Sequence, residues 1–160
     1  MRGELNGMAI HLDRMKQTLS SIERLEIKPV EDDEMLKIWA ATAIEGFELP
    51  VLNPIFVNLE SSLGVQQPFY RRYLAFLSHQ PVATSAVFLG ENVAGIYCVS
   101  TVPAARRMGI GAAVTLRALQ EAQARGYHIA VLHATQMGSR VYRQLGFQDI
   151  SVLRGYSPEK

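Results

Sequence analysis

A turn that contains two arginines and two glycines is the clearest chemical pattern in this sequence. Residues 93–102 before it are rich in β-forming side chains, and residues 110–125 after it have apolar residues at helical spacing. The first turn of a helix has N–H groups without partners and a partial positive charge, so it attracts anions. Glycines let a phosphate approach the backbone, and arginines add charge and donors. The turn, with Arg106, Arg107, Gly109 and Gly111, therefore predicts a phosphate site.

Two other phosphate-binding loops do not fit the spacing. A P-loop ends in Gly-Lys-Ser/Thr, whereas Gly111 is followed by two alanines. The dinucleotide-binding loop requires a third glycine where Val114 stands, and an acidic residue about twenty positions later, near Val131. A purely structural alternative stays open, in which the glycines only ease a strand-to-helix turn.

A second pattern follows the next apolar run. Residues 139–147 read Ser-Arg-Val-Tyr-Arg-Gln-Leu-Gly-Phe, which predicts a short helix ending at Gly146. Tyr142 lies 31 residues after Gly111, with one expected helix and one expected strand between them. Residues 106–111 resemble the Gln/Arg-x-x-Gly-x-Gly/Ala motif of the GNAT N-acetyltransferases, and residues 142–147 resemble their Tyr-x-x-Leu-Gly-Phe segment. The resemblance spans roughly Glu26 to Tyr156.

This resemblance implies that acetyl-CoA, or coenzyme A, is the co-substrate. It assigns coenzyme binding to the end of the strand before the turn, to the turn and helix start, and to one residue ahead of the last helix. By resemblance these residues are Val99, Ser100, Thr101, Val102, Arg106, Arg107, Met108, Gly109, Ile110, Gly111, Ala112 and Thr135. Thr135 stands where many relatives have an asparagine, seven residues before the tyrosine.

The implied reaction is attack of an amine on a thioester, through a tetrahedral oxyanion that expels a thiolate. A phenol with a pKa near 10 can protonate a thiolate whose thiol has a pKa near 8.5. The resemblance makes Tyr142 the general acid, and it takes the oxyanion donor from residues 99–102. The expected strands at 93–102 and 128–134 contain no carboxylate, so the base is unassigned. His133 is the nearest titratable candidate, and an ordinary strand histidine is its alternative role.

The expected elements form an α+β domain whose sheet is mixed but mostly antiparallel. One β-α-β crossover in this sheet forms the coenzyme site, as in the GNAT acyl-CoA N-acyltransferase fold. One face of the strand at 82–89 is expected to be half exposed. Core packing is the favoured role of Trp39, Phe47 and Phe56, and lining an acceptor pocket is the alternative. The elements are strands at 25–30, 70–77, 82–89, 93–102, 128–134 and 149–155, and helices from 31, at 54–63, at 110–125 and around 139–145.

The N-terminal part is the least informative. Residues 8–12 have the alternation of a short strand, whereas residues 15–25 suggest a weak helix or a linker. We therefore expect residues 1–25 to form an arm and residues 26–160 to form the acetyltransferase domain. The arm could pair with a sheet edge in a second copy, which would give a homodimer, or it could be the remnant of an upstream half.

Composition narrows the class of partners. The chain has 160 residues, of which 48% are hydrophobic and 19% charged, and its net charge is +1. We therefore expect neither nucleic acid nor a membrane as partner, since the charge is small and no apolar run approaches about 20 residues. The single cysteine, Cys98, fits a cytoplasmic protein. No metal site is expected, because the acidic run at 31–34 is better explained as a helix cap.

Two functions are consistent with the sequence. One is an N-acetyltransferase that moves an acetyl group from acetyl-CoA to a primary amine of an unidentified acceptor, which is a small molecule or a peptide. The other is a regulatory or non-catalytic module that binds coenzyme A. The retained Tyr142 favours the enzyme, and the missing strand carboxylate keeps the binding module open.

Overall fold

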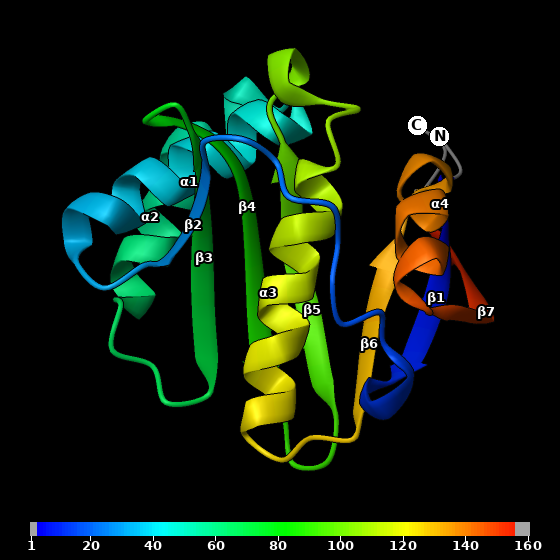
Figure 1. The fold of residues 1–160 in the computed structure, drawn as a ribbon. Helices are drawn as coiled ribbons and strands as arrows, with labels where there is room; N and C mark the ends of the chain where they lie inside the picture. Colours follow the sequence, from blue (N-terminus) through cyan, green and yellow to red (C-terminus); the bar gives the residue numbers. More distant parts are fainter. Residues whose placement is uncertain (1–2, 156–160) are drawn as a thin grey trace.

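Figure 1 shows the computed structural model of the chain, in which residues 3–155 are described. Residues 1–2 and 156–160, at the ends of the expected arm and domain, lie outside this range. No helix within residues 3–155 is long and apolar enough to cross a membrane. The elements are β1 (Gly3–His11), η1 (Leu12–Arg14), β2 (Leu25–Pro29), α1 (Asp33–Phe47), η2 (Pro50–Leu52), α2 (Asn53–Leu63), β3 (Tyr70–Leu77), β4 (Gln80–Leu89), β5 (Ala94–Thr101), η3 (Pro103–Ala105), α3 (Ile110–Ala124), β6 (Ile129–Ala134), α4 (Gln136–Leu145) and β7 (Gln148–Gly155).

The strands form one seven-stranded sheet in the order β2-β3-β4-β5-β6-β1-β7. Strands β3, β4 and β5 are antiparallel neighbours because short turns join them, and β2 pairs antiparallel with β3 although α1 and α2 lie between the two strands in the chain. Helix α3 crosses over to make β6 parallel to β5. Helices α3 and α4 lie in front of the sheet in Figure 1, and α1 and α2 lie behind it. The predicted α+β class with a mixed, mostly antiparallel sheet is confirmed.

The N-terminal strand is an inner strand of this sheet. Met8 of β1 pairs with Leu132 of β6 on one side and with Asp149 of β7 on the other. Both edges of β1 at this point are therefore occupied by the same chain, so Met8 is not free to add to the sheet of a second copy. The expected strand at 8–12 is real, but its partners are the last two strands of its own chain.

Helices cover the middle of the sheet on both faces. Residues 82–87 of β4 are all buried, because α1 packs on one face and α3 on the other. The expectation of a half-exposed face on this strand was wrong, since alternation in the sequence did not reveal the second helical layer. Trp39 is fully buried and donates its Nε1–H to the carbonyl of Tyr73 at 3.1 Å, while Phe56 stacks on it at 5.9 Å. Phe47, by contrast, is 41% exposed.

The inner position of β1 predicts that the strand contributes directly to stability. Met8→Ala should lower the free energy of unfolding by about 2–5 kcal/mol, because Met8 is fully buried and its truncation leaves a cavity. Leu5→Ala on the same strand should cost much less, since Leu5 is 37% exposed. Urea unfolding measures both values. Equal losses in the two variants would contradict the packing of β1 within the core.

Candidate functional site

The two parallel strands, β5 and β6, separate partway along their length. β5 and β6 pair only through Ala94 with Ala130 and through Gly95 with Val131. Beyond these pairs β5 runs on to Thr101 and β6 to Ala134 without further pairing between them. The edge of β5 that faces β6 therefore has backbone groups with no strand partner among the described residues. Such an edge can bind an extended chain of amide groups.

A bulge in β5 accounts for this separation. Thr84 pairs with Ser100 and Ala86 with Tyr97, so Ser85 alone stands opposite two residues of β5, Cys98 and Val99. Cys98 has a left-handed backbone with φ of 50°. A bulge of this kind bends its strand and increases the local twist.

The hydroxyl of Thr84 holds the bulge in place. It donates to the carbonyl of Cys98 at 2.7 Å and lies 2.9 Å from the hydroxyl oxygen of Ser100.

Burial raises the pKa of the Cys98 thiol to about 11. The thiol is therefore not a nucleophile near neutral pH.

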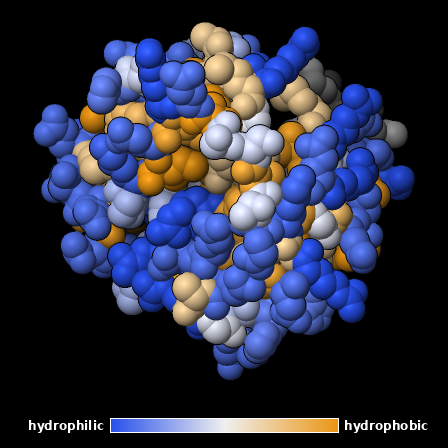
Figure 2. Space-filling model, in the orientation of Figure 1, coloured by the Kyte–Doolittle hydropathy of each residue, from blue (hydrophilic) through white to orange (hydrophobic). Residues whose placement is uncertain are grey.

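The predicted phosphate turn is located at the start of α3. Arg107 and Gly109 have left-handed backbones, with φ of 64° and 81°, and no side chain caps the helix at Gly109. Alternation of left- and right-handed residues turns successive N–H groups toward one point, which creates an anion-binding concavity. Ile110 and Ala112 are buried, so they can offer only backbone groups, whereas Met108 is 47% exposed. Figure 2 shows the upper part of this face, around the beginning of α3, as hydrophobic and hollowed toward α4.

The side chain of Arg106 has a different set of partners. Its Nε donates to the carbonyl of Thr101 at 3.1 Å, and its Nη2 donates to the carbonyl of Gly46 at 2.9 Å. The same Nη2 lies 2.8 Å from the carboxylate of Glu48. Arg106 thus connects the end of β5 with the C-terminal end of α1. The other arginine of the turn, Arg107, has no ion pair within residues 3–155.

Gly46 permits this close contact between α1 and β5. A Cβ atom at this position would lie 2.6 Å from the hydroxyl oxygen of Ser100 and 3.0 Å from the nitrogen of Thr101. Ser100 is itself buried, and the N–H of Val102 donates to the carbonyl of Val82 at 2.9 Å. The N–H of Val102 is therefore occupied within the sheet.

Tyr142 lies on the buried side of α4. Its ring packs edge-on against Phe147 at 5.9 Å, and Gly138 makes room for it, since a Cβ atom there would lie 3.1 Å from the ring. Burial raises the pKa of the Tyr142 hydroxyl to about 12, with no contribution from a neighbouring charge or side-chain hydrogen bond. The phenol is therefore fully protonated at neutral pH, as a proton donor must be.

Strand β1 positions α4, which the sequence did not reveal. The side-chain amide of Asn6 donates to the hydroxyl of Ser139 at 3.0 Å, and Ile10 packs beside Gly146 at the end of the helix. The apolar alternation at 8–12 was the only signal of this strand, and Asn6 lies outside it. Thr135 caps α4 by accepting from the N–H of Gly138 at 3.2 Å, so its hydroxyl already has a structural partner.

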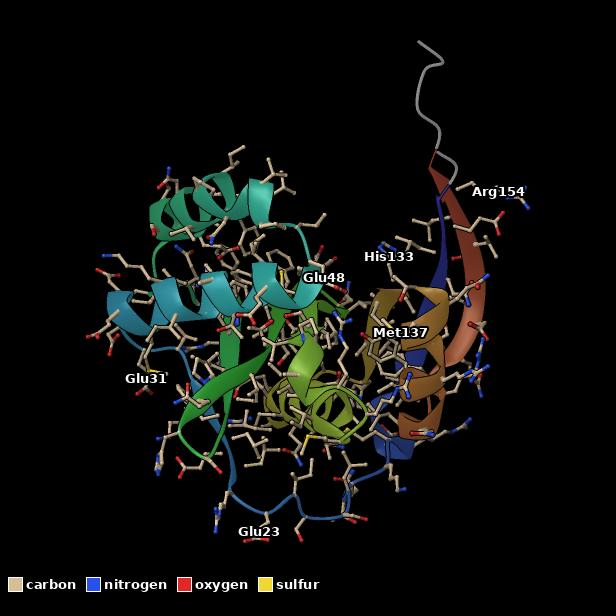
Figure 3. All side chains as sticks on the ribbon, turned by 90° about the horizontal axis from the view of Figure 1, so that it is seen from above. Glu23, Glu31, Glu48, His133, Met137 and Arg154 are labelled. Carbon is tan, nitrogen blue, oxygen red and sulfur yellow. The ribbon has the colours of Figure 1, made fainter. Side chains whose placement is uncertain are left out.

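Two titratable side chains face each other across the opening. Figure 3, seen from above, shows Glu48 at the end of α1 on one side, and His133 of β6 on the other. His133 is exposed, because its neighbours Leu132 and Ala134 point to the buried face of β6. Within residues 3–155, no group of three His, Cys, Asp or Glu side chains could bind a metal ion.

Comparisons with known proteins agree with this geometry. Residues 90–150 match the family model of the acetyltransferase (GNAT) domain, a segment that contains both the phosphate turn and Tyr142. A GCN5-related N-acetyltransferase from Kribbella flavida superposes with a TM-score of 0.73 at 22% identity, over 94% of this chain and 56% of that one. This chain therefore spans little more than half of that protein. No curated protein matches the chain.

Two further solved structures are similar along most of their own length. A predicted acetyltransferase from Clostridium acetobutylicum, determined with acetyl-CoA, gives a TM-score of 0.66 at 18% identity, over 79% of this chain and 91% of that one. A GCN5-related N-acetyltransferase from Ralstonia eutropha gives 0.67 at 21% identity, over 85% and 98%. The fold is thus the GNAT fold, and the resemblance of this chain to the GNAT acetyltransferases is confirmed. The match supports acetyl transfer as the general class of activity.

The raised pKa of Tyr142 predicts a loss of stability in alkali. The folded protein keeps this proton up to about pH 12, whereas the unfolded tyrosine ionises around 10.0. Its contribution is therefore fully present below pH 10 and is lost as the pH rises through that window. Tyr142→Phe should show a smaller fall in unfolding free energy between about pH 9 and about pH 11, measured by urea unfolding. An identical fall in both proteins would mean that the hydroxyl titrates as it does in the unfolded chain.

Proposed function

We propose that the protein is an N-acetyltransferase that moves an acetyl group directly from acetyl-CoA to a primary amine. The observation that carries the proposal is the separation of β5 from β6, in a sheet that also carries the uncapped start of α3 and the helix of Tyr142. We further propose that it acts in the cytoplasm, where the single thiol of Cys98 stays reduced.

The residues beside the separation of β5 and β6 offer the chemical groups that coenzyme A needs. We propose that backbone N–H groups from Arg106 to Ala112 bind the pyrophosphate, with the free guanidinium of Arg107 nearby. The unpaired edge of β5 at Val99–Thr101 would hold the amide-containing arm, and one of its N–H groups would stabilise the oxyanion. The coenzyme supplies the activated acetyl thioester. The side chain of Arg106 would act indirectly, by fixing α1 beside the turn.

The role proposed for Tyr142 is protonation of the departing thiolate. A phenol with a pKa of about 12 is a weaker acid than an exposed one, which by itself makes this transfer harder. Burial disfavours every anion in the same place, however, so a thiolate formed beside Tyr142 is also more basic than in water. The two shifts have the same direction, so the burial of Tyr142 does not by itself rule out this proton transfer.

The acceptor amine would enter from the side of α1. Glu48 lies on that side and His133 on the opposite side, and the carboxylate of Glu48 would attract an ammonium group. His133 is the proposed proton acceptor when the amine arrives protonated, because its imidazole is exposed on β6. Phe47 and Tyr97, 41% and 47% exposed, are the large side chains of α1 and β5 open to a substrate.

A coenzyme-A-binding module without catalysis is the second candidate. The observation in its favour is that neither β5 nor β6 contains a carboxylate that could act as base. A thiol-release assay with acetyl-CoA and a panel of amines separates the two. Release of free thiol that depends on an amine supports the enzyme, whereas tight coenzyme binding without release supports the module.

The phosphate turn can be tested at Gly111. A Cβ atom there would meet only the hydroxyl oxygen of Thr101 at 3.5 Å, and Gly111 has no positive φ, so a side chain fits. Gly111→Asp should weaken coenzyme A binding by at least about tenfold, because a carboxylate near a diphosphate repels it. Gly111→Asn has the same size without the charge and should lose much less. Calorimetry measures both affinities, and equal losses would contradict an anion site at the turn.

The acid role can be tested with Tyr142→Phe. This change keeps the ring and its packing on Phe147 and removes only the hydroxyl. Turnover should fall by about 10²–10⁴-fold, while coenzyme affinity stays within a few-fold. Steady-state kinetics and calorimetry give the two numbers. Full activity would remove Tyr142 from the mechanism, and a loss confined to affinity would make it a binding residue.

A further inference from the structure

Helix α2 and the turn before it form an exposed apolar ridge. Val51, Leu52, Ile55, Leu59 and Leu63, here called the α2 ridge, are 80%, 40%, 67%, 55% and 45% exposed. The last four recur every three or four residues and therefore lie along one side of the helix. A contiguous patch of large apolar side chains on a surface marks an interaction site, because each would otherwise be covered or replaced by polar residues.

The opposite side of α2 is already packed. Phe56 stacks on Trp39 of α1, and Glu60 is buried in an ion pair with Arg72 at 2.7 Å. The ridge therefore does not arise from a poorly docked helix. Figure 3 shows α2 as the outer helix on its side of the sheet, with α1 between it and the strands, so the ridge is open to a partner.

The ridge is also free of charge, which limits the kind of partner. Between Val51 and Gln67 the only ionisable residue is Glu60, and it is buried. A helix that lies on a membrane surface carries lysine or arginine on its polar face, and α2 has none. A strongly charged partner would find no complementary group there. An uncharged apolar stripe can face its own copy without like-charge repulsion.

The other exposed apolar surface has a different character. On β7, Ile150 and Val152 are 64% and 56% exposed, but this strand has charges at intervals. Arg154 pairs with Glu4 at 2.8 Å, and Asp149 pairs with Arg143 at 2.8 Å. Charged pairs of this kind discourage association at an edge strand.

We propose that the α2 ridge is the contact surface between two copies of this chain. A two-fold axis crossing the helix would place two antiparallel α2 helices side by side, each about 16 Å long. The five ridge side chains would form the apolar core of the contact, and exposed Asn58, Ser61 and Ser62 its polar rim.

The test is the mass of the full chain in solution, measured by light scattering and sedimentation over a range of concentrations. The parent protein should be a dimer. Ile55→Glu should halve the mass, with a dissociation constant raised by at least about 100-fold, because a charge is placed in the middle of the contact. Ile150→Glu is the matched control, since Ile150 is 64% exposed and Ile55 67%, and it should remain dimeric.

A mixing experiment guards against an unfolded variant. Leu59→Glu and Leu59→Lys should each be monomeric, and a mixture of the two should recover the dimer, because opposite charges then lie near each other across the two-fold axis. A monomeric parent protein, a dimeric Ile55→Glu variant, or equal dissociation by Ile150→Glu would each overturn the proposal. None of these measurements requires acetyl-CoA, so their outcome is independent of the proposed activity.

Discussion

The early separation of two parallel strands is the constraint on which the site depends. A parallel pair normally continues its hydrogen bonds along both strands, but β5 leaves β6 after Gly95. The bulge at Cys98 bends β5, and Thr84 fixes the bent carbonyl from the neighbouring strand. The phosphate turn and the start of α3 follow directly at the end of this strand. A straight β5 would continue its pairing with β6 and occupy the edge that is now unpaired.

The contacts of Arg106 link the end of α1 to the end of β5, so neither can move without the other. Arg106 contacts Thr101, Gly46 and Glu48, so the last turn of α1 and the end of β5 share one guanidinium. The ion pair with Glu48 is partly exposed and contributes little by itself. The two bonds to carbonyls have defined directions, and they keep the α1 end in register with the turn. A shift of the end of α1 would therefore also move the turn before α3.

Local features of the fold were predictable from the sequence, and long-range ones were not. Periodicity, turn residues and helix-ending glycines depend only on neighbouring residues. They predicted the strand at 70–77 and, to within one residue, the starts of α3 and β7. The turn before α3 and the helix that carries Tyr142 were predicted because each contains a short motif. The place of β1 was missed because pairing of Asn6 with Ala134 joins residues that are far apart in the chain. The left-handed Cys98 was missed because no glycine or asparagine marks it.

The side chain of Arg106 shows a different limit of sequence reasoning. An arginine in a phosphate motif suggests a side chain aimed at the ligand, yet the structure aims it at protein carbonyls. The residue type shows that a guanidinium is present at position 106. The position of α1, which the sequence does not show, determines which groups this guanidinium contacts. The same holds for Thr135, whose hydroxyl closes the first turn of α4.

The position of β1 also has a consequence for the order of events during synthesis. Strand β1 (Gly3–His11) is synthesised before its partners β6 and β7, because β2 to β5 lie between them in the chain. β1 therefore has no partner strand while β2 to β5 are translated, and its apolar residues Met8 and Ile10 stay uncovered in that interval. Strands β3 to β5 can pair earlier, since short turns join them. Closure of the sheet around β1 joins segments from opposite ends of the described residues, and long-range pairing of this kind is slow to form.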